Sequence, residues 1–410
     1  MKTVWLLNHY AQEPNGPGGT RHYSLARRLR VLGWRMIIVA SSVEHGTNRQ
    51  RLPEGKPWQL ESYDDVEFLW LRGNNYVGNG TNRIRNMLEY TFAATRVSPK
   101  MLPRPDVVIG SSVHPFAALA GSHLAKRFKV PFVFEIRDLW PQTLIDLGRL
   151  TPHHPMCVAL RWLERNLCRS ASRIITLLPD AYKYLETIGV PQNRIVWIPN
   201  GVEIGSGDLP SRQTHASAEQ PFTLMYFGAH GLANGLDNIL RAMQLLQQKP
   251  DAPKVKLRLI GDGPEKPRLR ELARDLHLAP EVFEPPVRKA DIPELASEAD
   301  AFIFNLVDAP VFKYGISSNK LFDYMAAQRP IIFCCKSSNN PVAESGGGIT
   351  VSPENPQLLA DTIERMALQS PEARHEMGLA ARRYVQAQYS FEKLGDILAT
   401  VLNECLILSR

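Results

Sequence analysis

TVWLLNHYAQEPNGPGGTRHYSLARRLRVLGWRMIIVAS, residues 3–41, contains a strand, a glycine-rich loop, a helix and a second strand in one continuous run. TVWLLN (3–8) and WRMIIVAS (34–41) are apolar runs of strand length, and residues 20–33 between them carry apolar side chains at helical spacing. Strands joined by a helix pair in parallel, and the resulting sheet is covered on both faces. The stretch therefore predicts a βαβ unit, the repeating element of an open α/β sheet.

The same alternation continues through both halves of the chain. In the first half the further apolar runs are VEFLWL (66–71), DVVIGSS (106–112), PFVFEI (131–136) and RIITLL (173–178), separated by helical spacing at 82–97, 115–128 and 156–170. In the second half they are FTLMYFG (222–228), KVKLRLIG (254–261), AFIFNL (301–306) and PIIFCC (330–335), with helical spacing near 235–247, 264–276, 317–327 and 355–369 and helices over 371–408.

A stretch rich in glycine, serine and proline divides the two halves. Residues 198–221 show no apolar periodicity, which is typical of a linker. The 410 residues also exceed the roughly 100–200 residues of one domain. We therefore predict two doubly wound, Rossmann-like parallel-sheet domains facing a central cleft, over 1–200 and 201–389, with a C-terminal helix at about 390–410 that returns to the first domain.

Composition and charge limit the compartment and the partners. The apolar runs fall well short of the about 20 residues that span a bilayer, and the sequence turns polar at Asn8 without a signal-peptide cleavage site. The five cysteines are odd in number and lack CxxC spacing, which suits the cytoplasm. The net charge of +7 indicates an anionic partner, namely nucleic acid, a phospholipid surface or a phosphorylated substrate, unless it is only a solvated basic surface.

Two strand ends in the first half suit a ligand that carries phosphate groups. Gly16, Gly18 and Gly19 precede a helix whose free amides attract anions, although such a turn is also common without a ligand. His114 follows the run at 106–112, and ligands of open α/β sheets bind at the carboxyl ends of strands. His114 is thus a catalytic candidate or a structural histidine.

A cluster of charges, Glu135, Arg137 and Asp138, ends the strand in FEIRDLWP. Several charges at the end of an apolar strand suggest a binding site. The alternative is an ion pair between the arginine and a carboxylate that holds the loop, and one residue can serve both roles.

Glycine turns follow the strands of the second half. Gly228, Gly231 and the trio Gly261, Asp262 and Gly263 each lie between a strand and a helix, so their backbone amides can face a nucleotide. DGP is also an ordinary turn.

Lys320 and Asp323 lie three residues apart on one helix in PVFKYGISSNKLFDYMAAQRPIIF (310–333). The lysine can neutralise a diphosphate, and the carboxylate can accept hydrogen bonds from two ribose hydroxyls. The alternative is a surface ion pair between the two side chains.

Five ordered motifs together resemble the family 4 retaining glycosyltransferases, in particular the bacterial O-antigen and capsule subgroup that includes L-fucosamine transferases. They are FEIRDLWP, IPNGVE, YFGAHGLANGLDNIL, GDGPEK and YGISSNKLFDYMAAQRP, and the likeness covers nearly the whole chain. The resemblance implies a GT-B fold with an N-terminal acceptor domain, a C-terminal nucleotide domain and a metal-independent, retaining mechanism. It places Gly18 and Gly19 at the donor diphosphate, His114 at the donor sugar, Asp323 at the ribose, and Gly261, Asp262 and Val287 around the base.

The chain departs from the family pattern at three positions. The first acid of the Glu-x7-Glu motif falls on Gly315, so the carboxylate expected near the transferred sugar is missing. The Arg and Lys that follow the first strand of the second domain fall on His230 and Asn234. We expect Lys320 to replace part of the missing positive charge, with helix N-termini contributing the rest.

The sequence predicts transfer of an N-acetylated hexosamine or deoxyhexosamine from a UDP donor to a saccharide or polyprenyl-diphosphate-linked acceptor, without a cofactor or metal. The alternatives are a nucleotide-sugar epimerase or hydrolase on the same fold, and a basic nucleic-acid-binding or membrane-binding protein that is not an enzyme. Known RNA-binding and helix-turn-helix signatures are missing from the sequence, so we predict no nucleic-acid partner. The predicted catalytic residues are His114, Asp138 and Lys320; the acceptor-binding residues are Glu135, Arg137 and Asp138; the donor-binding residues are Gly18, Gly19, Gly228, His230, Asn234, Gly261, Asp262, Val287, Ser318, Asn319, Lys320 and Asp323.

Two basic amphipathic stretches, 20–34 and 82–102, suggest that the protein lies on an anionic leaflet at the inner face of the plasma membrane. The alternative is that both apolar faces pack on the sheet, and we favour it for 20–34. In the second stretch Ile84, Met87, Leu88 and Phe92 recur at helical spacing, and Arg83, Arg85 and Arg96 supply positive charge.

Overall fold

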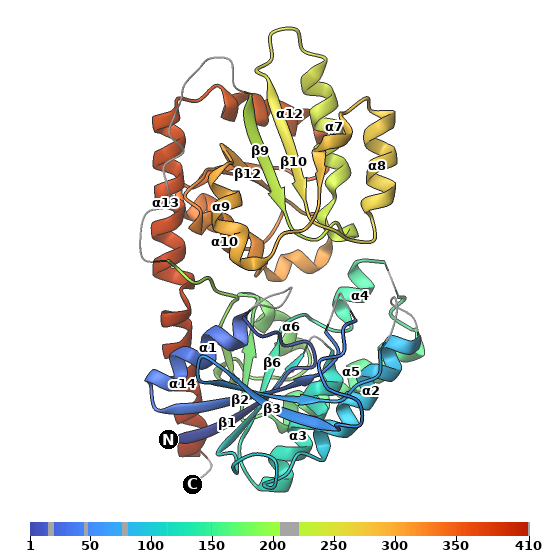
Figure 1. The fold of residues 1–410 in the computed structure, drawn as a ribbon, viewed down its shortest axis with the longest axis vertical. Coiled ribbons are helices and arrows are strands. Elements are labelled where there is room, and N and C mark those ends of the chain that lie inside the picture. Colours follow the sequence, from blue (N-terminus) through green and yellow to red (C-terminus); the bar gives the residue numbers. More distant parts are fainter. Residues whose placement is uncertain are drawn as a thin grey trace. The chain divides into compact units, whose positions relative to one another are not determined.

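The computed structural model describes residues 1–14, 20–44, 48–75, 81–112, 114–148, 150–205 and 221–408. The chain divides into two compact units (Figure 1). Unit 1 comprises Met1–Gly201, Tyr314–Ser317 and Phe391–Arg410, and unit 2 comprises Val202–Lys313 and Ser318–Ser390. Gly18 and Gly19, predicted to bind the diphosphate, lie outside the described residues.

Unit 1 is built on an eight-stranded sheet in the order β3-β4-β2-β1-β5-β6-β7-β8. Neighbouring strands pair in parallel, except that the edge strand β3 runs antiparallel to β4. The order of the strands along the chain reverses between β1 and β5, so their carboxyl ends border the switch point at which open α/β sheets bind ligands. The strands are β1 (Lys2–Leu7), β2 (Trp34–Ser41), β3 (Trp58–Tyr63), β4 (Val66–Leu71), β5 (Val107–Ser112), β6 (Phe132–Ile136), β7 (Arg173–Thr176) and β8 (Ile195–Trp197).

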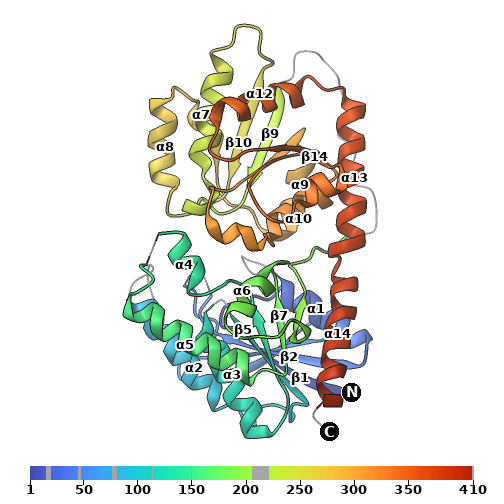
Figure 2. The same ribbon diagram turned by 180° about the vertical axis from the view of Figure 1, so that it is seen from behind.

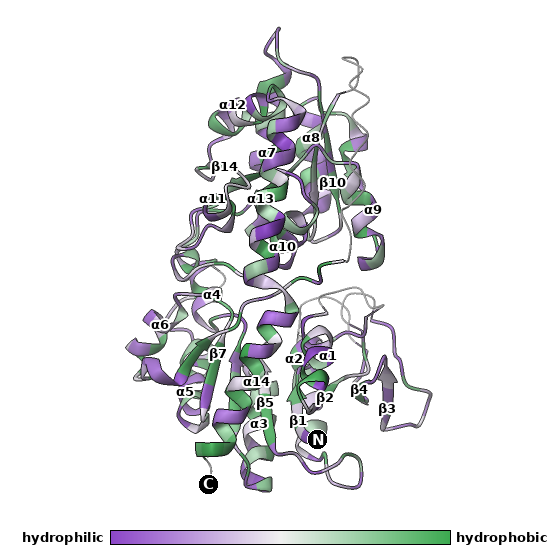
Figure 3. Cartoon of the chain, turned by 90° about the vertical axis from the view of Figure 1, so that its left-hand side faces the viewer, coloured by the Kyte–Doolittle hydropathy of each residue, from purple (hydrophilic) through white to green (hydrophobic). Residues whose placement is uncertain are grey.

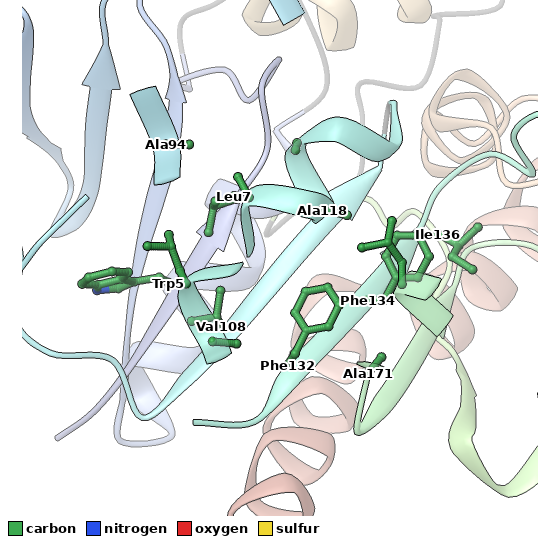
Figure 4. Close-up of a cluster of buried hydrophobic side chains, with 14 of the residues drawn as sticks. Trp5, Leu7, Ala94, Val108, Ala118, Phe132, Phe134, Ile136 and Ala171 are labelled. Carbon is green, nitrogen blue, oxygen red and sulfur yellow. The ribbon is translucent and has the colours of Figure 1, made fainter. Parts of the chain in front are cut away.

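Helices cover both faces of this sheet because its strands are apolar on both sides. In β1, Trp5 and Leu7 point into one core with side chains of α2, α3 and α5 (Figure 4). Val4 and Leu6 point into a second core, to which α1 and α14 contribute. The helices are α1 (Arg21–Val31), α2 (Thr81–Thr95), α3 (Pro115–Phe128), α4 (Gln142–Asp146), α5 (Pro155–Ser170), α6 (Ala181–Thr187) and α14 (Phe391–Leu408).

Unit 2 contains a six-stranded, all-parallel sheet in the order β11-β10-β9-β12-β13-β14. Its switch point lies between β9 and β12. The strands are β9 (Phe222–Phe227), β10 (Val255–Ile260), β11 (Phe283–Glu284), β12 (Ala301–Asn305), β13 (Ile331–Cys334) and β14 (Gly348–Val351). The helices are α7 (Leu236–Gln247), α8 (Lys266–Asp275), α9 (Ile292–Ser297), α10 (Asn319–Ala326), α11 (Pro341–Ser345), α12 (Pro356–Ala367) and α13 (Pro371–Tyr389).

The predicted strands and helices are all present, and four strands were not predicted. These strands, β3 (Figure 3), β8, β11 and β14, form the edges of their sheets. They are short or alternate in polarity, so they lack the continuous apolar run of a central strand. Part of the predicted linker is also structured, since Ile198 and Asn200 are buried in unit 1. Of the helices that the structure describes, none is long and apolar enough to cross a membrane.

Candidate functional site

His114 lies at the switch point of unit 1 and contacts a second histidine. It follows β5 and precedes α3, and its Nε2 lies 2.7 Å from Nδ1 of His9, which follows β1. Both side chains are buried. Burial, assisted by the charge of Arg83, lowers the pKa of His114 to about 3, so its ring is neutral at physiological pH.

Glu135, predicted to bind the acceptor, is instead the centre of a buried ion-pair network. Oε1 accepts hydrogen bonds from Nε and Nη2 of Arg21, and Oε2 accepts from Ser111 Oγ at 2.5 Å and from His22 Nε2 at 2.7 Å. Burial alone would raise the pKa of Glu135, but His22 and Arg21 hold it well below its usual value. With four donors on two buried oxygens, Glu135 holds β6 to α1 and β5, as the alternative of an ion pair that fixes the loop has it, and its contact with an acceptor stays a prediction.

Arg137 and Asp138 differ from Glu135 in exposure. Arg137 is half-buried and Asp138 is exposed, at the turn that follows β6. These two side chains of the predicted acceptor site therefore remain accessible to a ligand.

Lys320 occupies an aromatic niche near the switch point of unit 2. Its Nζ donates to the hydroxyl of Tyr226 at 3.0 Å and to Oδ1 of Asn234, and lies 4.6 Å from the Tyr226 ring centre and 5.2 Å from that of Phe304. Among the described residues no carboxylate lies within ion-pair distance of this ammonium group. Burial lowers the pKa of Lys320 to about 7.

Asp323 does not pair with Lys320, as a surface pair on one helix would. Both of its carboxylate oxygens lie 2.7 Å from Nζ of Lys289, and its side chain is mostly buried. Burial raises the pKa of Asp323, and Lys289 opposes the rise. The two functional candidates on α10 thus have separate partners.

The glycine turns of unit 2 pack against one another rather than presenting free amides. The amide of Gly228 donates to Ile260 and that of Gly261 to Glu284. A Cβ on Gly261, where φ is +143°, would lie 2.0 Å from the carbonyl oxygen of Gly228, and one on Gly263 would lie 2.4 Å from that of His230. We predicted that the amides of Gly228 and Gly261 face a nucleotide, but both donate to backbone carbonyls in this structure. Gly261 and Gly263 are required for the close packing of these turns.

His230 is wholly buried beneath these turns. Its amide donates to the Asp262 carbonyl, and its ring packs edge-on to Phe283. His230 is as fully buried as His114, so contact of either ring with the donor stays a prediction.

The remaining predicted donor residues stay accessible. Asp262 and Val287 are exposed, and Asn234 is partly exposed. Ser318 is the N-cap residue of α10 and Asn319 is its first residue; both are half-buried, and the Ser318 side chain makes no cap hydrogen bond.

Sequence reasoning missed several residues of these clusters. His9 follows a strand of the switch point, so the rule that singled out His114 applies to it as well. Tyr226 and Lys289 carry no comparable signal, since one lies within a strand and the other begins a short, polar 3-10 helix.

Each unit of the chain matches a known protein family. Residues 18–201 match the Glycosyl transferase 4-like domain, and residues 221–369 match the Glycosyl transferases group 1 domain. The chain carries glycosyltransferase domains in both of its units. No curated protein matches the chain in sequence.

Solved structures of low sequence identity share the fold of this glycosyltransferase chain. Sucrose-phosphate synthase from Thermosynechococcus elongatus is 16% identical over 100% of both chains, with a TM-score of 0.77. HepE from Anabaena, in complex with UDP-glucose, is 14% identical over 98% of this chain and 100% of its own, with a TM-score of 0.67. WaaG, a glycosyltransferase involved in lipopolysaccharide biosynthesis, is 16% identical over 98% of this chain and 99% of its own, with a TM-score of 0.68. The predicted GT-B fold is confirmed.

Proposed function

We propose that the protein is a retaining, metal-independent glycosyltransferase that moves an N-acetylated hexosamine or deoxyhexosamine from a UDP donor. The acceptor is a saccharide or a polyprenyl-diphosphate-linked sugar, and the product belongs to a cell-surface glycan such as O-antigen or capsule. The observation that carries the proposal is Lys320, a poorly exposed cation without an acidic partner among the described residues.

An anionic ligand would complete the surroundings of Lys320. Its present contacts are neutral oxygens and aromatic faces, which stabilise an ammonium group less than a phosphate does. Lys320 also lies in the first turn of α10, where the helix dipole favours negative charge. A diphosphate is the group that the donor of a glycosyltransferase would place there.

Asp323, one turn further along α10, would bind the ribose. A carboxylate has about four lone-pair sites, so its contacts with Lys289 leave capacity for two ribose hydroxyls. Val287 and Asp262 are exposed and would lie around the base.

The chemistry needs no enzymic nucleophile in this proposal. The bond between the anomeric carbon and the donor phosphate oxygen breaks as the acceptor hydroxyl forms its bond on the same face, and a donor phosphate oxygen takes the hydroxyl proton. Lys320 stabilises the charge that develops on the departing UDP. His114, as a neutral hydrogen-bonding group, holds the transferred sugar. Removal of divalent metal with a chelator should leave the rate unchanged.

Association with an anionic membrane is part of the proposal, and α2 is the candidate contact. Ile84, Leu88 and Phe92, spaced four residues apart, form an exposed apolar stripe, with Phe92 58% exposed. Arg85 beside the stripe is 74% exposed, and the guanidinium of Arg96 lies 3.6 Å from the ring centre of Phe92. Within the layer of α2, α3 and α5 (Figure 2), Trp162 of α5 is 69% exposed. Exposed Arg and aromatic side chains together favour a membrane surface.

Calorimetric titration tests the donor assignment. We expect UDP to bind more tightly than GDP or dTDP, and Lys320→Met to weaken UDP binding at least tenfold. Preferred binding of GDP or dTDP would exclude the UDP donor. The epimerase and hydrolase alternatives are separated by product analysis, since they would consume a UDP sugar without an acceptor.

A further inference from the structure

Two side chains of unit 2 contact the ammonium group of Lys320. Nζ lies 3.0 Å from the hydroxyl oxygen of Tyr226, in β9, and also contacts Oδ1 of Asn234, in the turn that follows β9. Both of these side chains also contact the backbone carbonyl of Ala229, the Tyr226 hydroxyl at 2.7 Å and Nδ2 of Asn234 at 2.9 Å. One carbonyl group is thus shared by the two neighbours of the lysine.

The carbonyl of Ala229 fixes the direction of these hydrogen bonds, because a carbonyl oxygen can only accept. Burial raises the pKa of Tyr226, so its hydroxyl keeps one proton, which is donated to Ala229. The hydroxyl oxygen is then an acceptor for Lys320. Exchanging the two ends of the Asn234 amide would set Oδ1 against the carbonyl and Nδ2 against the ammonium group. Both neighbours of Lys320 therefore act as acceptors.

The turn that carries Asn234 is itself held in place. Nδ2 of Asn305, at the end of β12, donates to the carbonyl of Asn234 at 2.8 Å, and Oδ1 of Asn305 accepts from Asn238 at 3.1 Å. A Cβ on Gly228 would lie 3.1 Å from Cδ of Lys320, and its φ of +148° also favours glycine. The lysine side chain is thus packed along its stem and held at its tip.

An ammonium group has three N–H donors, and the contacts with Tyr226 and Asn234 occupy two of those of Lys320. The third has no acceptor among the residues that the structure describes. We propose that Tyr226 and Asn234 are positioning residues that orient the Lys320 ammonium group and leave its third N–H for the donor diphosphate. The inference rests on the proposed function, in which Lys320 binds that diphosphate.

Holding the lysine in place before the donor arrives should raise the affinity for the donor. A lysine side chain without such contacts has many rotamers, and ordering it on binding costs affinity. Two neutral acceptors lower that cost without neutralising the charge, as a carboxylate partner would. We therefore expect the loss of either acceptor to weaken binding of UDP-N-acetylglucosamine roughly 3- to 10-fold.

Lys320 titrates near neutral pH, whereas the titratable groups beside it do not. Burial lowers the pKa of Lys320 to about 7. Burial raises the pKa of Cys335 to about 12, also raises that of Tyr226, and lowers that of His230 to about 4. These three groups stay neutral between pH 6 and pH 9. A change in the titration of Lys320 in this range therefore reports on its own hydrogen bonds.

NMR of protein labelled with 15N-lysine measures the titration of Lys320, and the spectrum of Lys320→Met assigns its resonance. Tyr226→Phe keeps the ring beside Nζ but removes an acceptor that favours the charged form, so the pKa of Lys320 should fall by roughly 0.5–1. Asn234→Asp places a carboxylate beside Nζ, so this pKa should rise by about 1 or more. Both variants should bind UDP-N-acetylglucosamine more weakly, the second because its carboxylate competes with the diphosphate.

Tyr384→Phe is the matched control, because it makes the same change at a tyrosine of α13 whose hydroxyl donates to Glu344. It should titrate and bind as the wild type does. An unchanged pKa of Lys320 in folded Tyr226→Phe and Asn234→Asp, or shifts in the same direction, would overturn the proposal, as would shifted pKa values with unchanged affinity. The titration needs no donor, so it decides the positioning role even if the wild type binds no UDP sugar. Calorimetry with UDP-N-acetylglucosamine recognises failure of the proposed function separately.

Discussion

Lys320 and Glu135 are both charged and poorly exposed, but their surroundings differ. The carboxylate of Glu135 is matched by Arg21 within unit 1, and every donor around it belongs to that unit. The ammonium group of Lys320 contacts neutral acceptors and aromatic rings, and no carboxylate lies within ion-pair distance of it in the part of the chain that the structure describes. The ion pair of Glu135 with Arg21 holds secondary-structure elements together. The Lys320 ammonium group is instead placed to bind an anionic ligand.

The pKa of Lys320 leads to a testable pH dependence. In the free protein the lysine is charged below about pH 7 and loses its charge above it, whereas a bound diphosphate favours the charged form. The affinity for UDP-N-acetylglucosamine, whose phosphates do not titrate in this range, should therefore fall by up to about tenfold per pH unit above pH 7. Titration calorimetry between pH 6 and pH 9 measures the effect.

Lys320→Arg is the control for this pH dependence, because a guanidinium keeps its charge over the whole range. Its profile should be flat. A wild-type profile that is also flat would mean that Lys320 does not touch the diphosphate.

Asp323→Asn should weaken UDP binding by about 1–3 kcal/mol, because the neutral amide accepts ribose hydrogen bonds less strongly than the carboxylate. Lys289→Met is the matched variant, since it removes the partner cation and leaves the carboxylate for ribose. We expect it to bind UDP at least as tightly as the wild type. Equal UDP affinity in folded Asp323→Asn and wild type would restrict Asp323 to its ion pair with Lys289.

Residue roles could be predicted only where the position of a residue along the chain implies its place in the fold. His114 follows a central strand, so its place at the switch point was predictable. The place of Glu135 near the end of β6 was predictable in the same way. Its partners Arg21 and His22, however, lie more than 110 residues away in sequence, and no local spacing indicates that they meet. The same holds for Lys289 and Asp323.

At the scale of elements, α1 and α2 have similar basic amphipathic sequences but different surroundings. α1 packs against β2 and α14, so its apolar face is covered, as the preferred interpretation of 20–34 has it. α2 packs on α3 through one side and exposes Ile84, Leu88 and Phe92 on another. Helical periodicity predicted both helices. It does not predict which of their apolar side chains are buried, because that depends on the packing of neighbouring elements.

Co-sedimentation with liposomes tests the membrane contact of α2. Binding should require anionic lipid and weaken with salt, and the pair Leu88→Glu and Phe92→Glu should abolish it because both side chains are removed from the apolar stripe. Arg85→Glu should weaken it by removing positive charge. Leu368→Glu, at an apolar residue of unit 2 that is 69% exposed, is the matched control and should bind as the wild type does. Equal binding to neutral and anionic vesicles, or none to either, would refute the electrostatic membrane contact.

At the scale of the whole molecule, two doubly wound sheets were predictable because a buried parallel strand needs a continuous apolar run. β1, β5, β9 and β12 are such strands, and they border the two switch points. The edge strands β3 and β11 were not predictable, since pairing with a neighbour rather than apolar sequence defines them. The identity of the acceptor does not follow from the fold, because glycosyltransferases of one fold serve many acceptors.

Acceptor-dependent transfer distinguishes a glycosyltransferase that uses Lys320 from a hydrolase on the same fold. The purified chain is incubated with UDP-N-acetylglucosamine and a polyprenyl-diphosphate-linked monosaccharide, with wild type and Lys320→Met in parallel, and the product is identified by mass spectrometry and proton NMR. We expect a disaccharide that keeps the anomeric configuration of the donor, UDP released in equal amount, and a rate at least 100-fold lower for Lys320→Met. Release of free N-acetylglucosamine at the same rate with and without the acceptor would contradict this expectation.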